Sequence, residues 1–159
     1  MKKLIRKYGI MLNHKEQRIL NTVIVLIIIG LALSCTENYT SKYDSYDDLI
    51  KSSDLSKGWV PEIIPNDSKN IIETHNIDNN RIFGYFDFSN NSFIDSLEEY
   101  NKMQTVDSVI NNLRQTKRPK RPSWFISELN LISLKPIIFR HSEFYIICDT
   151  INKKGYFLR

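Results

Sequence analysis

The stretch Asn70–Phe88, NIIETHNIDNNRIFGYFDF, decides the fold that the sequence predicts. Residues 70–77 and 81–88 are rich in β-branched and aromatic side chains, which favour extended strands. Between them, the turn 78–80 consists of Asp and Asn, which tolerate the positive φ that a tight turn requires. We therefore expect an antiparallel β-hairpin.

The second strand of this hairpin carries large apolar side chains on both faces. Gly84 interrupts the run, and a glycine inside a strand lets a neighbouring side chain approach the backbone closely. We therefore expect both faces to be covered and an aromatic ring to lie near Gly84. The side chains are Ile82, Phe86 and Phe88 on one face, and Phe83 and Tyr85 on the other.

A helical period follows the hairpin. Ser92 is a suitable N-cap, and apolar residues then recur at steps of three and four, which is the spacing of one helix face. The pattern predicts one long amphipathic core helix from Ser92 to Leu113, with an interruption near Thr105 left open. The apolar residues are Phe93, Leu97, Tyr100, Met103, Val106, Ile110 and Leu113.

A shorter helix is predicted before the hairpin. Ser41, followed by Asp44, resembles a capping box, and Gly58 can adopt the left-handed conformation that ends a helix. Trp59 is expected to fold back onto the last turn and to bury most of its ring.

Three extended segments, residues 135–140, 143–150 and 155–159, complete the predicted fold. The fold is of the α+β class: an antiparallel sheet packed against one long amphipathic helix, with a short N-terminal helix. Cys148 lies among apolar residues in the second of these segments. We expect it to be a buried core side chain and not a catalytic thiolate.

The segment Ile19–Cys35 decides where the protein is located. Six Lys and Arg residues precede or border it, and the apolar run Val23–Leu33 follows, which is the layout of a signal peptide. An uncleaved membrane helix is the alternative, although the strongly apolar core is short for a span of about 20 residues. Met11 offers a second start that would give a signal of more ordinary length.

The end of this segment, Leu31-Ala32-Leu33-Ser34-Cys35, resembles the lipobox of bacterial lipoproteins. The resemblance implies cleavage before Cys35 and attachment of lipid, including palmitate, at that cysteine. It therefore implies a membrane-anchored protein of the bacterial cell envelope that faces the periplasm or the cell exterior. The expected parts are a signal peptide (1–34), a lipid-anchored tether (35–41) and a single α+β domain (42–159).

The composition argues against several functional classes. The chain has a formal charge of +4, but residues 1–35 hold six basic residues and one acidic residue, so residues 36–159 are close to neutral. A near-neutral exported domain gives no support for binding nucleic acid. The sequence contains no paired-cysteine or clustered-histidine metal motif, no phosphate-binding glycine loop and no nucleophile motif. We therefore expect no metal, no cofactor and no enzymatic activity.

A second resemblance covers residues 43–88. The pattern Gly-Trp-x-Pro followed by His-x-x-Asp-x-Asn resembles that of small bacterial lipoproteins of unknown function. The chain departs from that family's usual residues at Asp67, Ser68 and Asn79. The resemblance implies an envelope location and a shape, and it implies no activity. The matching residues are Gly58, Trp59, Pro61, Pro65, Ile71, His75, Asp78 and Asn80.

The candidate binding residues are Trp59, His75, Asp78 and Asn80. Glu73 shares a strand face with His75, because side chains two residues apart in a strand point the same way. Asp78 and Asn80 are expected close by, in the turn. Two interpretations stay open: the group forms only a turn, or it forms a binding site at one end of the sheet.

Three functions are compatible with these features of the sequence. We expect a membrane-anchored, non-enzymatic binding or structural module whose protein partner is unidentified. The alternatives are an immunity-like or inhibitor protein, and a small hydrolase that uses His75 as a base. The lipid on Cys35 would attach the protein to the membrane in each case.

Overall fold

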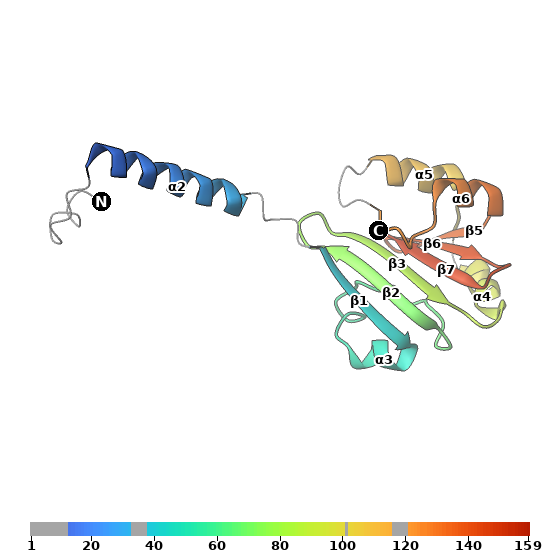
Figure 1. The fold of residues 1–159 in the computed structure, drawn as a ribbon. Helices are drawn as coiled ribbons and strands as arrows, with labels where there is room; N and C mark the ends of the chain where they lie inside the picture. Colours follow the sequence, from blue (N-terminus) through green and yellow to red (C-terminus); the bar gives the residue numbers. More distant parts are fainter. Residues whose placement is uncertain (1–12, 33–37, 101, 116–120) are drawn as a thin grey trace. The chain divides into compact units, whose positions relative to one another are not determined.

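The computed structural model describes residues 13–32, 38–100, 102–115 and 121–159 (Figure 1). The chain divides into two compact units, residues 1–36 and residues 37–159. The predicted lipidation site, Cys35, lies outside the described residues.

The first unit contains one described helix, α2 (His14–Ala32). The side chain of Asn13 accepts hydrogen bonds from the backbone N–H groups of Lys15 and Glu16, at 3.0 Å each. The Glu16 carboxylate in turn accepts the Asn13 N–H at 2.8 Å, so the helix begins with a reciprocal cap. Within the described ranges, no helix combines the length and the apolar character needed to span a membrane.

The described part of the second unit contains seven strands in one antiparallel sheet (Figure 1). Their order across the sheet is β1-β2-β3-β7-β6-β5-β4, so β1 and β4 are the edge strands. The strands are β1 (Asn38–Ser45), β2 (Lys69–Asn76), β3 (Arg81–Asp87), β4 (Lys102–Met103), β5 (Ile137–His141), β6 (Phe144–Asp149) and β7 (Lys154–Leu158).

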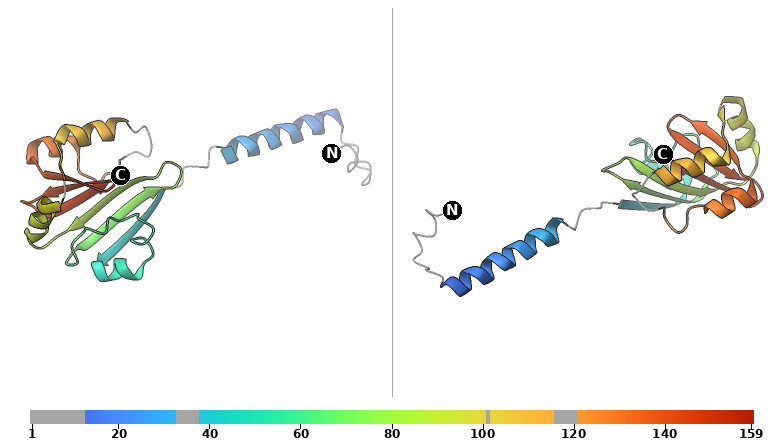
Figure 2. Two further views of the ribbon diagram at one scale, coloured as in Figure 1. Left: turned by 180° about the vertical axis from the view of Figure 1, so that it is seen from behind. Right: turned by 90° about the horizontal axis from the view of Figure 1, so that it is seen from above.

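Helices cover both faces of this sheet, as the views from opposite sides show (Figure 2). On one face, which we call the α3/α4 face, α3 (Tyr46–Lys51) and α4 (Ser92–Tyr100) contribute to the core. On the other, the α5/α6 face, the core includes side chains of α5 (Val106–Gln115) and α6 (Glu128–Leu134). Each face therefore has its own hydrophobic cluster.

The α3/α4 cluster is rich in phenylalanine. Phe157 packs edge-on against Phe144 and tilted against Phe86, with ring centroids 5.9 and 6.4 Å apart. Cys148 belongs to this cluster and is fully buried, so the expectation of a core cysteine is confirmed. Burial raises the pKa of its thiol to about 12, which keeps it protonated and unreactive at neutral pH.

Two glycines let aromatic rings lie directly on the backbone of neighbouring strands. A Cβ on Gly84 would approach the Phe157 ring to 1.8 Å, and a Cβ on Gly155 would approach the Phe86 ring to 2.1 Å. Gly84 pairs with Phe157, and Phe86 pairs with Gly155, across the β3–β7 ladder. The expected approach of an aromatic ring to Gly84 is confirmed, and the arrangement is reciprocal.

The prediction of one long helix packed on the sheet is wrong. The segment 92–113 forms α4, the short edge strand β4 and then α5. The apolar residues of α4, such as Leu97, are buried on the α3/α4 face, whereas Val109 of α5 is buried on the opposite face. The chain must therefore pass around the edge of the sheet at β4, which a continuous helix cannot do. The apolar spacing is the same on both sides of the break, and spacing alone does not reveal a change of face.

The predicted N-terminal helix is too long at both ends. Residues 38–45 pair with β2 as a strand, and α3 begins only at Tyr46. Ser45 is the N-cap, and its Oγ accepts the Asp48 N–H at 3.3 Å. The helix ends at Lys51, and turns lead from there to Gly58, whose φ of 71° is left-handed as expected. Residues 38–41, part of the predicted tether, thus lie in β1.

The hairpin prediction is confirmed, because β2 and β3 pair directly with Asn76 opposite Arg81. The three C-terminal extended segments are also present as β5, β6 and β7. Helix α6 was not expected. Its N-cap is Ser127, whose Oγ accepts the Asn130 N–H at 3.0 Å.

Candidate functional site

A buried carboxylate and a buried imidazole lie together on the α3/α4 side of β2. Glu73 and His75 alternate along the strand, so both side chains point to this face. Glu73 is fully buried and His75 is only 3% exposed. The two carboxylate oxygens of Glu73 lie 3.1 and 3.0 Å from Nδ1 of His75. The expectation that these two side chains share a face is confirmed.

This contact decides which nitrogen of His75 carries the proton in the neutral ring. A carboxylate only accepts hydrogen bonds, so Nδ1 must be the donor. The other nitrogen, Nε2, is then an acceptor, and it is buried without a hydrogen-bond partner among the described residues. An unpaired polar atom in a protein interior is costly. His75 therefore has unused hydrogen-bonding capacity at Nε2.

Two aromatic rings stack against His75. Trp59 lies nearly parallel to the imidazole, with ring centroids 3.6 Å apart and an interplanar angle of 23°. Tyr39 is the partner of His75 in the β1–β2 register, and its ring lies 5.5 Å away at 17°. Tyr39 is 46% exposed, whereas Trp59 is partly buried. The imidazole is thus held between a carboxylate and aromatic surfaces, and Tyr39 extends this group to the solvent.

The loop that carries Trp59 is fixed by backbone contacts. The Trp59 N–H donates to the Asp54 carbonyl at 3.1 Å, and Gly58 provides the left-handed turn before it. Arg159, at the C-terminus, donates from Nη1 to the Gly58 carbonyl at 3.2 Å. The position of Trp59 therefore depends on local contacts with Asp54 and Gly58 and on one contact from Arg159, which is distant in the sequence.

A second polar group lies next to Trp59. The Tyr43 hydroxyl donates to the Asp54 carboxylate, which also pairs with Lys57 at 3.7 Å. The Lys57 ammonium lies 4.4 Å above the Trp59 ring, a cation–π contact. Burial raises the pKa of Tyr43, and the neighbouring Asp54 carboxylate raises it further. The Trp59 ring is therefore contacted by both His75 and a cation.

Burial also raises the pKa of Glu73, because the charged form loses its water. The hydrogen bond and the electrostatic interaction with His75 act in the opposite direction and lower this pKa, but desolvation is the larger effect. Such a pair could transfer a proton or hold a hydrogen-bond donor. Within the described residues, no group of three His, Cys, Asp or Glu side chains could hold a metal ion.

The structure brings only part of the predicted group together. Among the described residues, His75 contacts Glu73, Trp59 and Tyr39, and Asp78 is not one of its partners. Asp78 lies exposed in the turn. Asn80 has a φ of 57°, and its side-chain and backbone oxygens accept hydrogen bonds from Arg159. The geometry of Asn80 thus fits the turn interpretation, and that of Trp59 and His75 fits the site interpretation.

Three residues at the site were not expected there from the sequence. Tyr39 falls in the predicted tether, and Tyr43 and Asp54 fall in the predicted N-terminal helix. Asp54 is only 8% exposed. The alternation of Tyr39, Ser41 and Tyr43 would have indicated a strand. No local signal predicts the burial of Asp54, because its partner Tyr43 lies eleven residues earlier.

Comparison with models of protein families finds a match to part of the chain. The model of the YbbD head domain family matches residues 37–87, slightly under a third of the chain. The matched segment runs from β1 to β3 and contains Trp59, Glu73 and His75. Searches of curated proteins and of solved structures find no significant match. The site therefore lies within the part of the chain that is similar to the YbbD head domain.

Proposed function

We propose that this protein is a membrane-anchored lipoprotein of the bacterial envelope whose domain binds a protein partner without chemical turnover. The observation that carries the proposal is the aromatic group at the β1 edge of the sheet. There, the half-exposed Tyr39 stacks on His75, which is itself backed by Trp59 and Glu73. Rigid, well-supported aromatic side chains of this kind provide much of the energy in protein interfaces.

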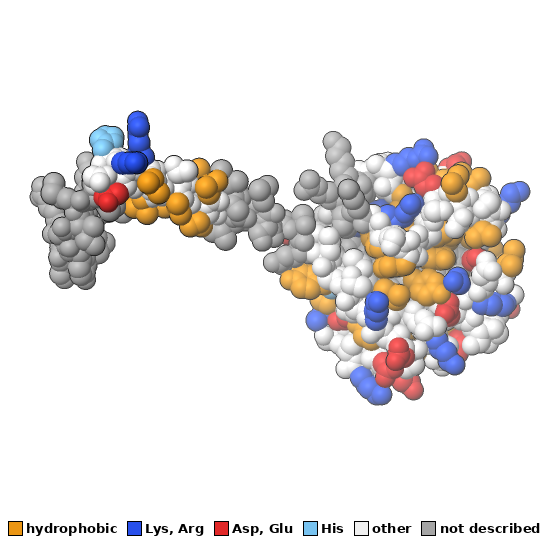
Figure 3. Space-filling model, in the orientation of Figure 1, with side chains coloured by type: hydrophobic (Ala, Val, Ile, Leu, Met, Phe, Trp, Pro, Cys, Tyr) orange, Lys and Arg blue, Asp and Glu red, His pale blue; other side chains and the backbone are white. Residues whose placement is uncertain are grey.

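The position of Tyr39 supports this proposal. It lies on β1, at one end of the strand order, and an edge strand can accept an added strand from a partner. The neighbouring charges Lys42 and Asp44 are exposed and of opposite sign. The face seen in Figure 3 likewise mixes basic and acidic side chains, with no extended field of one sign. A protein partner fits such a surface better than a polyanion does.

The burial of His75 favours binding over catalysis. A general base must reach the proton that it removes, within about 3 Å or through one water. Here Nε2 is buried and the Trp59 ring lies against the imidazole. A substrate could reach this nitrogen only if Trp59 moved away.

Site-directed photo-crosslinking in the source organism tests the binding proposal. Benzoylphenylalanine at position 39 should capture one protein, and the same group at Ile151, an exposed turn position 77% open to solvent, should not. Trp59→Ala should abolish capture at position 39, because the stack is lost. The same product from both positions, or none from position 39, would refute the proposal.

Metabolic labelling with a palmitate analogue tests the anchor separately. The parent should incorporate the label and remain with membranes, and Cys35→Ser should not incorporate it. More than one acyl chain is expected, since a single chain binds membranes only marginally. Equal labelling of the parent and the variant would show that Cys35 is not the attachment site.

One observation favours a hydrolase as a second candidate. A carboxylate bound to Nδ1 orients the imidazole and leaves Nε2 free to accept a proton, as in catalytic triads. If the protein hydrolyses esters or amides, His75→Gln should abolish activity on a substrate panel while Asp78→Asn leaves it intact. Absence of activity in the parent would exclude this candidate for those substrates.

A further inference from the structure

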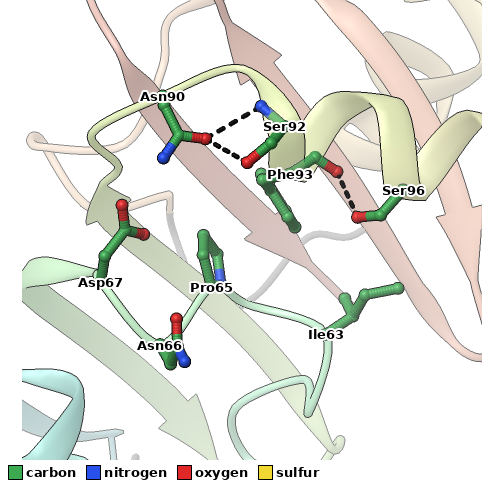
Figure 4. A pocket seen from close by; sticks show the side chains of 8 residues that line it. All are labelled: Ile63, Pro65, Asn66, Asp67, Asn90, Ser92, Phe93 and Ser96. Atoms are coloured by element: carbon green, nitrogen blue, oxygen red, sulfur yellow. Dashed lines mark hydrogen bonds between the residues drawn. The ribbon is translucent and has the colours of Figure 1, made fainter.

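A cleft of about 360 Å³ lies on the α3/α4 face, and His75 is not among the residues that line it (Figure 4). It is formed by two segments that are separated in sequence: the loop 63–67 before β2, and residues 90–96, which begin two residues before α4. Eight side chains line it: Ile63, Pro65, Asn66, Asp67, Asn90, Ser92, Phe93 and Ser96. This volume is at the lower end of the range for small-molecule sites, about 300 to 1,000 Å³. A ligand the size of one six-membered ring would therefore fit.

Polar and apolar side chains both line the cleft. Figure 4 shows Asp67 and Asn90 at one end and Pro65 in the middle, with Phe93 and Ile63 toward the other end, where Ser92 and Ser96 also lie. Phe93 is only 7% exposed, so its ring forms the bottom of the cleft and not its outer edge. A ligand that fills this cleft must itself have a polar edge and an apolar face.

The side-chain amides and hydroxyls are partly oriented by the protein. The Asn90 side-chain oxygen accepts from both the N–H, at 2.9 Å, and the hydroxyl of Ser92. Its NH₂ group lies on the side away from Ser92 (Figure 4). The Ser96 hydroxyl donates to the Phe93 carbonyl at 2.7 Å, so its oxygen remains an acceptor. The cleft thus offers both donors and acceptors.

The donors, acceptors and apolar side chains of the cleft together indicate the chemical class of its ligand. Phosphate and carboxylate only accept hydrogen bonds and would face Asp67, the one charged side chain among those that the structure places in the cleft. An ammonium only donates, so it could not use the amide donors of Asn66 and Asn90. A sugar hydroxyl both donates and accepts, and a sugar ring presents C–H groups to an apolar wall.

We propose that this cleft binds a neutral saccharide, with the hydroxyl edge on Asp67 and Asn90 and a C–H face on Pro65 and Phe93. The site is independent of the Tyr39, His75 and Trp59 group and does not require the protein partner proposed above. The Asp67 carboxylate accepts two vicinal hydroxyls, and the amide groups of Asn66 and Asn90 pair with the remaining polar atoms.

NMR titration of the ¹⁵N-labelled full-length chain tests this assignment, in a detergent that contains no sugar. Glucose, galactose, mannose and N-acetylglucosamine are the neutral probes; glucuronic acid and glucosamine carry the same ring with a negative or a positive charge. At least one neutral sugar should shift the amide signals of residues 63–67 and 90–96, with a Kd on the order of 1 mM. Glucuronic acid should bind at least about fivefold more weakly, because of repulsion by Asp67.

Two variants with the same change of charge provide the control. Asp67→Asn should weaken binding of the neutral sugar about tenfold, the loss expected for hydrogen bonds to a charged group. Asp95→Asn, at an exposed position of α4 outside the cleft, should leave binding unchanged. Both variants should melt at the parent temperature. The proposal is overturned if no neutral sugar shifts these signals, if glucosamine or glucuronic acid binds best, or if both variants behave alike.

Discussion

The two faces of the sheet differ in what they bury. The α5/α6 face is covered mainly by apolar and aromatic side chains such as Phe83 and Leu131. It also buries Arg81, whose guanidinium lies over the Phe83 ring and donates to the Asn112 carbonyl of α5. The α3/α4 face has an equally apolar centre around Phe157, but near β1 it also buries Glu73 and His75. A buried carboxylate costs free energy even when it is hydrogen-bonded. The two faces therefore bury charge differently: the α5/α6 face holds a cation against an aromatic ring and a helix carbonyl, whereas the α3/α4 face holds a carboxylate–imidazole pair beside the edge strand β1.

The largest effect is expected at the centre of the α3/α4 face. Phe157→Ala removes a fully buried ring that packs on Phe86, Phe144 and the backbone of Gly84. We expect the free energy of unfolding to fall by about 3 to 5 kcal/mol, as in other large-to-small core substitutions. Urea denaturation of parent and variant measures this loss. A decrease below about 1 kcal/mol would show that the cavity collapses at little cost, contrary to close packing.

A smaller effect is expected at the β1 end. Trp59→Ala removes the ring that stacks on His75, but Trp59 is only partly buried, so we expect a loss of about 2 to 3 kcal/mol, less than for a fully buried ring. Trp59→Phe keeps a stacking ring and should recover more than half of that stability. Parent-like melting of Trp59→Ala would instead mark Trp59 as a residue kept only for binding.

The buried carboxylate is expected to make stability depend on pH. Because burial raises its pKa, Glu73 holds its proton more tightly in the folded state than in the unfolded state. The resulting stability is present at pH values below the pKa of the unfolded chain and is lost as the pH rises through the folded pKa. Glutamine can still accept the His75 Nδ1–H but does not titrate. Glu73→Gln should therefore be more stable than the parent near pH 7, on the order of 1 kcal/mol, and this advantage should shrink toward pH ~4.

Denaturation curves at several pH values test this prediction, with Glu143→Gln, at an exposed position, as the control. If Glu73→Gln is less stable than the parent at pH 7, the ionised carboxylate stabilises the fold through His75 more than its burial costs.

The smallest effect is expected on the outside of the α5/α6 face. Arg114 in α5 pairs with Glu128 in α6 at 2.7 Å, and the arginine side chain is 65% exposed. Water and salt screen such a pair, so Arg114→Ala should leave the melting temperature unchanged within error. A clear decrease in the melting temperature that disappears in high salt would show that this ion pair holds α5 and α6 together.

Local patterns predicted the elements that depend on neighbouring residues. The alternation and turn residues of the stretch 70–88 predicted the hairpin, and the two-residue spacing placed Glu73 beside His75. Non-local geometry was not predictable in this way. Arg159, about a hundred residues later, donates to the carbonyl of Gly58 next to Trp59, and no local pattern predicts this contact. The break at β4 depends on which face of the sheet each helix covers, and apolar spacing carries no such information.

The reciprocal pairing of glycine and phenylalanine between β3 and β7 also fixes the alignment of the two strands. A slip by one residue would turn every side chain to the wrong face, so hydrophobic alternation already prevents it. A slip by two residues keeps each side chain on its own face of the sheet, so hydrophobic alternation does not prevent it. In one direction it would set Phe86 opposite Phe157, and in the other it would leave Gly84 opposite Gly155, with a void between them. The two glycines therefore allow β3 and β7 to pair in only one register at the centre of the sheet.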